Sequence, residues 1–202
     1  MKEFTVPMAL LDFVPVTLFF ISCILIGHDL RRKLNTVSKV LYFAGFILVS
    51  AAGALKALYK LIYAAGAGDI SWMSGQFFAN ESLGFLLAGA GLMYSLKDSK
   101  KKGGNVSMAI IPTAGLVAII VIGETAMFAA LCRYASKLKK TVAIVLFVLA
   151  YFMSLCMGYL SSRDFDTASI NWAAQGINTL GQLSFLAGAL ILHKAGLGKE
   201  EP

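Results

Sequence analysis

Six apolar segments, each of about twenty residues or more, take up most of the chain, and short polar or basic stretches separate them. About 20 apolar residues are enough for a helix to cross the hydrocarbon core of a bilayer. Backbone polar groups in that core must be satisfied within the protein, so only helices and closed barrels span it. The segments lack the alternating pattern of barrel strands. The sequence therefore predicts an all-α, polytopic membrane protein with six transmembrane helices, at approximately residues 7–27, 40–65, 72–96, 106–132, 141–160 and 171–192.

The composition agrees with a lipid environment. Of the 202 residues, 58% are hydrophobic and 14% are charged, whereas a soluble domain has about 25% charged residues. No stretch between the segments is long enough to form a soluble domain, so residues 1–202 are expected to form a single membrane domain. The expected location is the cell membrane, which the chain crosses several times, and the lipid bilayer is the expected partner.

The net charge of +7 does not indicate a nucleic-acid-binding protein. The Lys and Arg residues cluster in short runs between apolar segments, where membrane proteins carry their cytoplasmic loops. Cys23, Cys132 and Cys156 lie in or at the ends of apolar segments, at spacings that match no metal-binding motif. We interpret them as small packing residues and expect no metal, no cofactor and no nucleic-acid partner. The sequence leaves open whether the protein forms a homodimer.

A stretch near the middle of the chain recurs near its end. Trp72 and Trp172 are 100 positions apart, as are Phe85 and Phe185, and two Leu-Ala-Gly-Ala runs are 99 positions apart. A spacing close to half the chain length favours an internal duplication, although two Gly/Ala-rich helices can also resemble each other by chance. We predict a first repeat at residues 7–97, a basic linker at 97–105, a second repeat at 106–193 and a short polar tail at 194–202.

Each predicted repeat has three helices, an odd number, so with six full spans the second repeat enters the membrane in the opposite sense. Inverted repeats of this kind are typical of secondary transporters, whose binding site lies at the repeat interface. The arrangement broadly resembles small transporters built from three-helix repeats, such as the sugar and vitamin-precursor facilitators. Those transporters have seven spans with a linker helix, so the resemblance concerns architecture only and assigns no role to any residue.

The basic residues do not give one consistent orientation for six spans. With the N-terminus outside, nine of the Lys and Arg residues between and beyond the segments fall on the cytoplasmic side and seven on the outer side. The first half then follows the positive-inside rule and the second half opposes it. A re-entrant fourth segment, dual insertion, or dominance of the first half would each account for this conflict. We adopt six full spans with dominance of the first half, because this topology places three charged residues at one depth.

Those three residues are Lys56, Glu81 and Glu124. Each lies eight or nine residues from the outer end of its segment, which is roughly 12–14 Å at about 1.5 Å per residue. Charges at such a depth are expensive unless they are paired or hydrated, and they are functional candidates by default. We predict that Lys56 lies within about 4–5 Å of at least one of the two carboxylates. Lys60 and Asp12 lie nearer the helix ends, and we interpret them as a snorkelling lysine and an interfacial carboxylate.

Polar side chains form a stripe on the last helix of each predicted repeat. Gln76 and Asn80 are four residues apart, so they share a helix face beside Glu81. The second stripe comprises Gln175, Asn178 and Gln182. Such stripes line a solute pathway if they meet near a central axis, and hydrogen bonding between helices is the alternative. The candidate substrate-binding residues are therefore Gln76, Asn80, Glu81, Glu124, Lys56, Asn178 and Gln182.

The leading functional hypothesis is a small integral membrane transporter or channel for a polar or cationic solute, with its site between the two repeats. A non-catalytic membrane sensor or a partner-docking subunit is the alternative. An intramembrane enzyme that uses Glu81 and Glu124 as acid and base is less favoured, since no nucleophile stands near them in the sequence. His28 and His193 lie on opposite sides of the membrane in the six-span topology, too far apart to share a metal or a haem.

Overall fold

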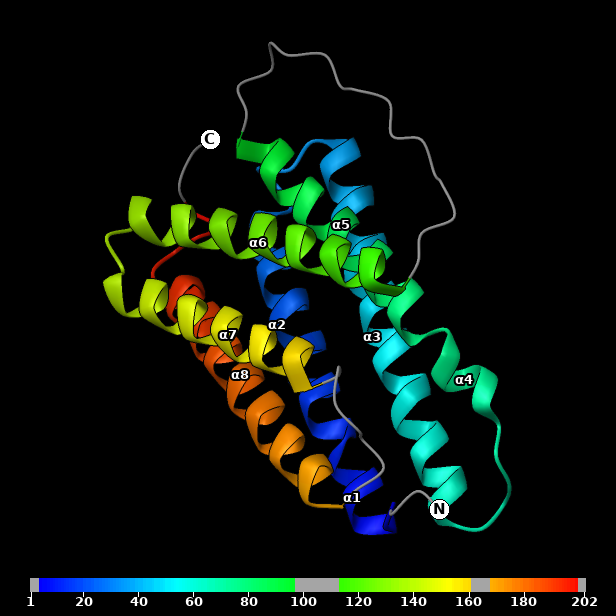
Figure 1. Ribbon diagram of the computed structural model, residues 1–202. Coiled ribbons are helices and arrows are strands. Elements are labelled where there is room, and N and C mark those ends of the chain that lie inside the picture. The colour runs from blue at the N-terminus through cyan, green and yellow to red at the C-terminus, as the bar shows by residue number, and fades with distance from the viewer. Residues whose placement is uncertain (1–3, 97–112, 161–167, 200–202) are drawn as a thin grey trace.

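The computed structural model describes residues 4–96, 113–160 and 168–199, and within these ranges all regular secondary structure is α-helical (Figure 1). The predicted helical class is therefore confirmed for the described residues. Four stretches are long and apolar enough to cross a membrane, at Val6–Leu30, Thr36–Ala64, Gly115–Lys137 and Thr141–Leu160. The helices are α1 (Val6–Leu11), α2 (Phe13–Leu30), α3 (Thr36–Ala64), α4 (Ser71–Gly75), α5 (Phe77–Leu96), α6 (Thr113–Lys137), α7 (Thr141–Leu160) and α8 (Ala168–Lys194).

Local signals explain where several helices begin and end. The α3 helix begins after Asn35, whose side chain accepts a hydrogen bond from the backbone N–H of Ser38 at 2.8 Å. It ends just before Gly66, which has a φ of +73°, a conformation that glycine adopts without steric strain. Asp12 separates α1 from α2, and Gln76 separates α4 from α5. The first and third predicted segments are therefore each divided near one end.

The six long helices form a closed ring in chain order. Each of α2, α3, α5, α6, α7 and α8 packs against the next, and α8 completes the ring by packing against α2. Figure 1 shows α7 and α8 side by side on one side of α2, with α3 on the other side. The α5 and α8 helices carry polar residues and are not among the four apolar stretches, yet each packs between two of them.

The α2 and α8 helices run in the same direction. Near the start of both helices, Gln175 donates a hydrogen bond to Asp12 at 2.9 Å. At the other end of both, the His193 ring lies 2.9 Å from Asp29. The α7 helix runs antiparallel to α8 according to their contacts, and antiparallel to α6 because only residues 138–140 connect these two helices. The α2, α6 and α8 helices therefore share one direction.

The α5 and α6 helices also share this direction. The backbone of Gly123 in α6 lies against Leu86 of α5. Further along both helices, the hydroxyl groups of Ser95 and Tyr134 are 2.9 Å apart. The end of α5 and the start of α6 consequently lie toward opposite ends of the bundle.

These directions contradict the predicted inversion of the two repeats. An inverted repeat requires the first helix of each half to run in opposite senses, but α2 and α6 run in the same sense. The prediction failed because it assumed that a chain leaving α5 at one surface must start the next helix at that surface. The predicted linker at 97–105 and the predicted start of the second repeat at 106 lie outside the described residues.

Ten of the twelve described Lys and Arg residues gather at one end of the bundle, which we call the basic end. This end contains the α2–α3 connection, the α6–α7 connection and the end of α8. Its basic residues are Arg31, Arg32, Lys33, Lys39, Arg133, Lys137, Lys139, Lys140, Lys194 and Lys199. The prediction that the second half opposes the positive-inside rule is therefore wrong for these residues. An orientation with the basic end in the cytoplasm satisfies the rule for these ten residues.

Cysteine labelling tests this orientation. We expect Arg32→Cys and Lys137→Cys, each in a variant without the native cysteines, to react with a membrane-impermeant maleimide only after the cells are lysed. Ala67→Cys, in the exposed turn after α3, should react in intact cells, because that turn lies at the end opposite the basic end. Labelling of Lys137→Cys, but not of Arg32→Cys, in intact cells would instead restore six alternating spans.

Candidate functional site: a polar cavity inside the helix ring

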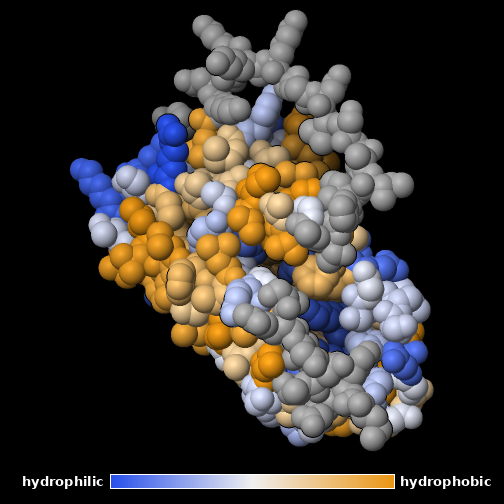
Figure 2. All heavy atoms as spheres, viewed as in Figure 1, coloured by the Kyte–Doolittle hydropathy of each residue, from blue (hydrophilic) through white to orange (hydrophobic). Residues whose placement is uncertain are grey.

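A cavity of about 430 Å³ lies inside the ring, and all six long helices contribute to its walls. Its lining is confined to the half of the bundle that is farther from the basic end. The α2 helix, for example, lines it only as far as Phe19, and α3 lines it from Val49 to Lys60. Figure 2 shows hydrophilic residues inside a hollow on the viewed face of the molecule. The cavity thus gives polar groups a place inside a largely apolar bundle.

Five phenylalanine rings, one each from α2, α5, α6, α7 and α8, form what we call the aromatic layer: Phe19, Phe85, Phe128, Phe147 and Phe185. All are at most 8% exposed. The Phe185 ring lies at the centre of the layer, and the centroids of three of the other rings are between 5.4 and 6.1 Å from its own centroid. The layer stands between the cavity and the basic end, and the space beyond it is filled by buried side chains such as Leu30, Leu92, Leu131 and Leu192.

One group of side chains on the cavity wall forms a hydrogen-bonded ion pair. The Lys60 ammonium lies 2.7 Å from one Asp12 carboxylate oxygen and donates a hydrogen bond to the Asn171 side chain at 3.2 Å. The Gln175 amide donates to the other Asp12 oxygen at 2.9 Å and to the backbone carbonyl of Met8. Lys60 is only 9% exposed, so the interpretation of Lys60 as a snorkelling lysine is wrong. Asp12 faces the cavity as well, and so is not merely interfacial.

Glu124 of α6 is held by Ser154 of α7. The Ser154 hydroxyl lies 2.6 and 2.8 Å from the two carboxylate oxygens, and Glu124 is 4% exposed. A hydroxyl group has one proton to donate. Ser154 therefore satisfies only part of the hydrogen-bonding capacity of this carboxylate.

Glu81 and Lys56 face the cavity without forming an ion pair. Among the described residues, Glu81 makes no hydrogen bond or ion pair, although it lies close enough to Lys56 to interact electrostatically. No ion pair within 4.0 Å joins Lys56 to Glu81 or to Glu124. The Lys56 ammonium instead lies 3.7 Å from the centroid of the Phe77 ring and 5.8 Å from that of Phe78. An aromatic face is therefore the contact that the structure gives to the Lys56 ammonium, and the distance of about 4–5 Å to a carboxylate stays a prediction.

Apart from the Asp12 oxygen that pairs with Lys60, three buried polar atoms on the cavity wall have no hydrogen-bond partner among the described residues. They are Ser50 Oγ, Gln175 Oε1 and Gln182 Oε1. Buried polar atoms are nearly always hydrogen-bonded in native proteins. These atoms therefore indicate positions where water or a ligand completes the hydrogen bonding.

The structure brings five of the seven predicted site residues to one cavity. These are Lys56, Glu81, Glu124, Asn178 and Gln182. Gln76 and Asn80 are not part of the lining, and Gln76 is exposed at the break between α4 and α5. The polar lining residues that the predicted set missed include Asp12, Lys60, Ser154, Asn171 and Gln175.

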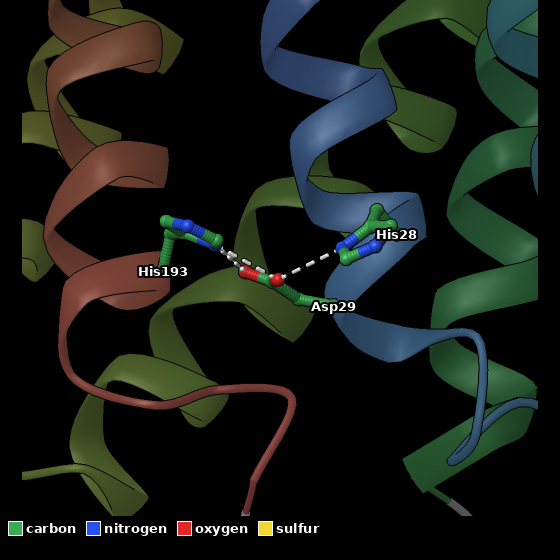
Figure 3. Close-up of polar contacts among 3 residues, drawn as sticks. All are labelled: His28, Asp29 and His193. Atoms are coloured by element: carbon green, nitrogen blue, oxygen red, sulfur yellow. Dashed lines mark hydrogen bonds and ion pairs between the residues drawn. The ribbon is translucent and has the colours of Figure 1, made fainter.

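Asp29 lies between two histidines at the basic end, outside the cavity (Figure 3). The Nδ1 atom of His193 is 2.9 Å from an Asp29 carboxylate oxygen, and that of His28 is 3.5 Å from the same oxygen. The prediction that the two histidines lie on opposite sides of the membrane is therefore wrong. The arrangement joins α2 to α8. Within the described residues, no group of three or more His, Cys, Asp and Glu side chains is arranged to hold a metal ion.

Comparison with known protein families, curated proteins and solved structures finds no match to this chain. The function is therefore inferred from the cavity itself.

Proposed function

We propose that the protein is a small integral membrane transporter or channel for a polar or cationic solute, located in the cell membrane, with its solute site in the cavity. The observation that carries this proposal is Glu81, a carboxylate on the cavity wall without a hydrogen bond or ion pair among the described residues. An ionisable group at membrane depth is functional by default, because it is costly unless protein or water satisfies it. A solute pathway supplies the missing partners.

The charges on the cavity wall favour a cation over an anion. Asp12 and Lys60 form an ion pair with each other, which leaves the carboxylates of Glu81 and Glu124 facing one further ammonium group, that of Lys56. Lys56 and Glu81 belong to the first half of the chain and Glu124 to the second, so both halves contribute to the proposed site.

The position of the cavity supports a direction of access. We propose that the bundle lies in the membrane with its basic end toward the cytoplasm. The cavity then lies in the outer half of the bundle, and the aromatic layer closes it from the cytoplasm. Passage of a solute to the cytoplasm would require these rings to separate, as expected of a carrier or a gated channel.

Replacement of Glu81 by glutamine tests the proposal, since it keeps the shape of the side chain and removes its charge. The purified protein is reconstituted in proteoliposomes and screened for uptake of a panel of radiolabelled polar and cationic solutes. We expect saturable uptake of at least one solute, and we expect Glu81→Gln to abolish it while the variant elutes from size exclusion as the wild type does. Lys194→Gln, a change at the exposed end of α8, serves as the control and should transport normally.

A partner-docking subunit is the second candidate, because the ten basic residues at one end offer a surface for an acidic partner. Absence of uptake across the panel, together with a salt-sensitive complex that Lys137→Glu weakens, would favour this candidate. An intramembrane enzyme finds less support. Ser154 lies beside Glu124, but both histidines lie at the basic end, where neither can serve as its base.

A further inference from the structure

Several hydrogen-bond acceptors on the cavity wall have no partner among the described residues. The Gln175 side-chain nitrogen donates to the Met8 carbonyl and to Asp12, so the amide orientation is fixed and its oxygen is left as an acceptor. Gln175 is 7% exposed, and this oxygen has no partner among the described residues. The side-chain oxygen of Gln182 also has no hydrogen-bond partner among the described residues. The Glu81 carboxylate adds further acceptors. A ligand that completes these bonds must carry several N–H or O–H donors.

The surroundings of Lys56 show which donor group the cavity accommodates. Its side chain is a primary amine on an alkyl chain, and its ammonium lies over the face of Phe77 at 3.7 Å. Aromatic faces attract ammonium groups through the electron density of the ring. The same wall presents the carboxylate of Glu81, which interacts with Lys56 through its charge. Lys56 thus occupies a position suited to the ammonium group of a ligand.

Other parts of the wall are apolar. Val16, Val49, Ile120 and Val121 line the cavity beside the aromatic rings, and the volume of about 430 Å³ accommodates a small organic molecule. A bare metal cation needs a shell of several ligands, and within the described residues no three His, Cys, Asp or Glu side chains are arranged to hold one. The wall therefore fits a molecule that carries both a cationic head and an apolar body.

We propose that the solute is an organic primary amine with an apolar body, whose ammonium group binds between Glu81 and the Phe77 ring and competes there with the ammonium of Lys56. This assignment rests on the proposed solute site and specifies its ligand. In the absence of solute, the Lys56 side chain serves as a tethered counter-charge for Glu81. The arriving amine replaces it over the ring and donates to the unpartnered oxygens of the wall.

Binding of 2-phenylethylamine tests the proposal. The full-length protein is placed in phosphatidylcholine nanodiscs, and equilibrium binding of the radiolabelled amine is measured by scintillation proximity. We expect saturable binding, displaced by unlabelled amine but not by 2-phenylethanol or 3-phenylpropanoate, which have a similar body without the positive charge. Glu81→Gln should weaken binding by about tenfold or more, because a charge-assisted hydrogen bond is lost. Lys56→Met should strengthen it several-fold, because a competing cation is removed. Lys194→Met, which removes an exposed lysine outside the cavity, should leave it unchanged.

The alternatives give different results. If 3-phenylpropanoate binds and Lys56→Met abolishes that binding, the cavity takes anions, so the amine assignment is wrong while a solute site remains. If Glu81→Gln binds the amine as the wild type does, or if Lys56→Met weakens binding, the proposed position of the ammonium is wrong. If none of the three probes binds, the amine assignment fails, and the uptake screen decides separately whether the protein transports another solute.

Discussion

Replacement of Lys60 by methionine is expected to lower the free energy of unfolding by about 3–5 kcal/mol, the range measured when one member of a buried ion pair is removed. Lys60 supplies the positive charge beside Asp12, at 2.7 Å, and also donates to Asn171. Methionine keeps the length and the apolar stem of the side chain. The loss of stability therefore comes mainly from the Asp12 carboxylate, to which, among the described residues, the Gln175 amide is left as the donor. Unfolding in mixed micelles of a mild detergent and dodecyl sulfate measures the change.

Lys56→Met is the matched control, because Lys56 lies on the same helix, faces the same cavity and forms no ion pair within 4.0 Å. It should destabilise the protein much less than Lys60→Met. The double variant Asp12→Asn with Lys60→Met should recover a large part of the loss, since the Asp12 charge that Lys60 neutralised is then removed as well. Equal effects of the two lysine variants would contradict the ion pair. A double variant as unstable as Lys60→Met alone would show that packing, rather than charge, sets the effect.

The pairing of Asp12 with Lys60 shows that the sequence indicates the depth of a charged residue but not its neighbour on another helix. Asp12 lies six residues after the start of α1 at Val6, and Lys60 lies four residues before the end of α3 at Ala64. In antiparallel neighbours these positions fall at similar depths. The depth comparison that grouped Lys56 with Glu81 could therefore also have placed Asp12 and Lys60 at one depth. The sequence gives the depth of each residue below its own membrane surface. It does not show which helices are neighbours, so the two residues could not be matched as a pair.

The helical class and the approximate spans followed from the sequence because the length of an apolar segment and its lack of alternation determine them. The direction of each helix did not follow from the sequence. A count of spans gives the directions only if each helix runs opposite to the one before it, and α5 and α6 run in the same direction. The basic residues held the missing information. Lys137 and Arg32 lie at the same end of the bundle, and the positive-inside rule without the span count would have placed them together.

The polar stripes predicted the cavity lining correctly on α8 but not at the start of α5. Gln76 and Asn80 lie one helical turn apart at the start of α5, where the Asn80 N–H donates to the Gln76 carbonyl at 3.1 Å, yet neither residue lines the cavity. On α8 the helix is continuous, and Gln175, Asn178 and Gln182 all reach the cavity. Periodicity therefore shows which residues share a helix face, but not whether that face is turned toward the cavity.

Replacement of Gly45 by alanine is expected to lower the free energy of unfolding by about 1–3 kcal/mol, the range for overpacking a close contact. A β-carbon at Gly45 would lie less than 3.0 Å from backbone atoms of Gly84 and Ala88 in α5. Backbone atoms cannot rotate away as a side chain can, so α3 and α5 must separate. Small residues permit this close approach, which is how membrane helices gain packing energy without a hydrophobic driving force.

Gly176→Ala is the matched control, because it makes the same substitution in a helix where no atom lies within 4 Å of the added carbon. It should leave stability unchanged or raise it by up to about 1 kcal/mol, the difference in helix propensity between glycine and alanine. The α5 helix carries Glu81 and Phe85, so its separation from α3 should also move the carboxylate away from Lys56 and weaken binding of 2-phenylethylamine. If Gly45→Ala matches Gly176→Ala in stability, the two backbones are not in contact. Reduced stability with unchanged amine binding would instead show that the cavity wall does not depend on this contact.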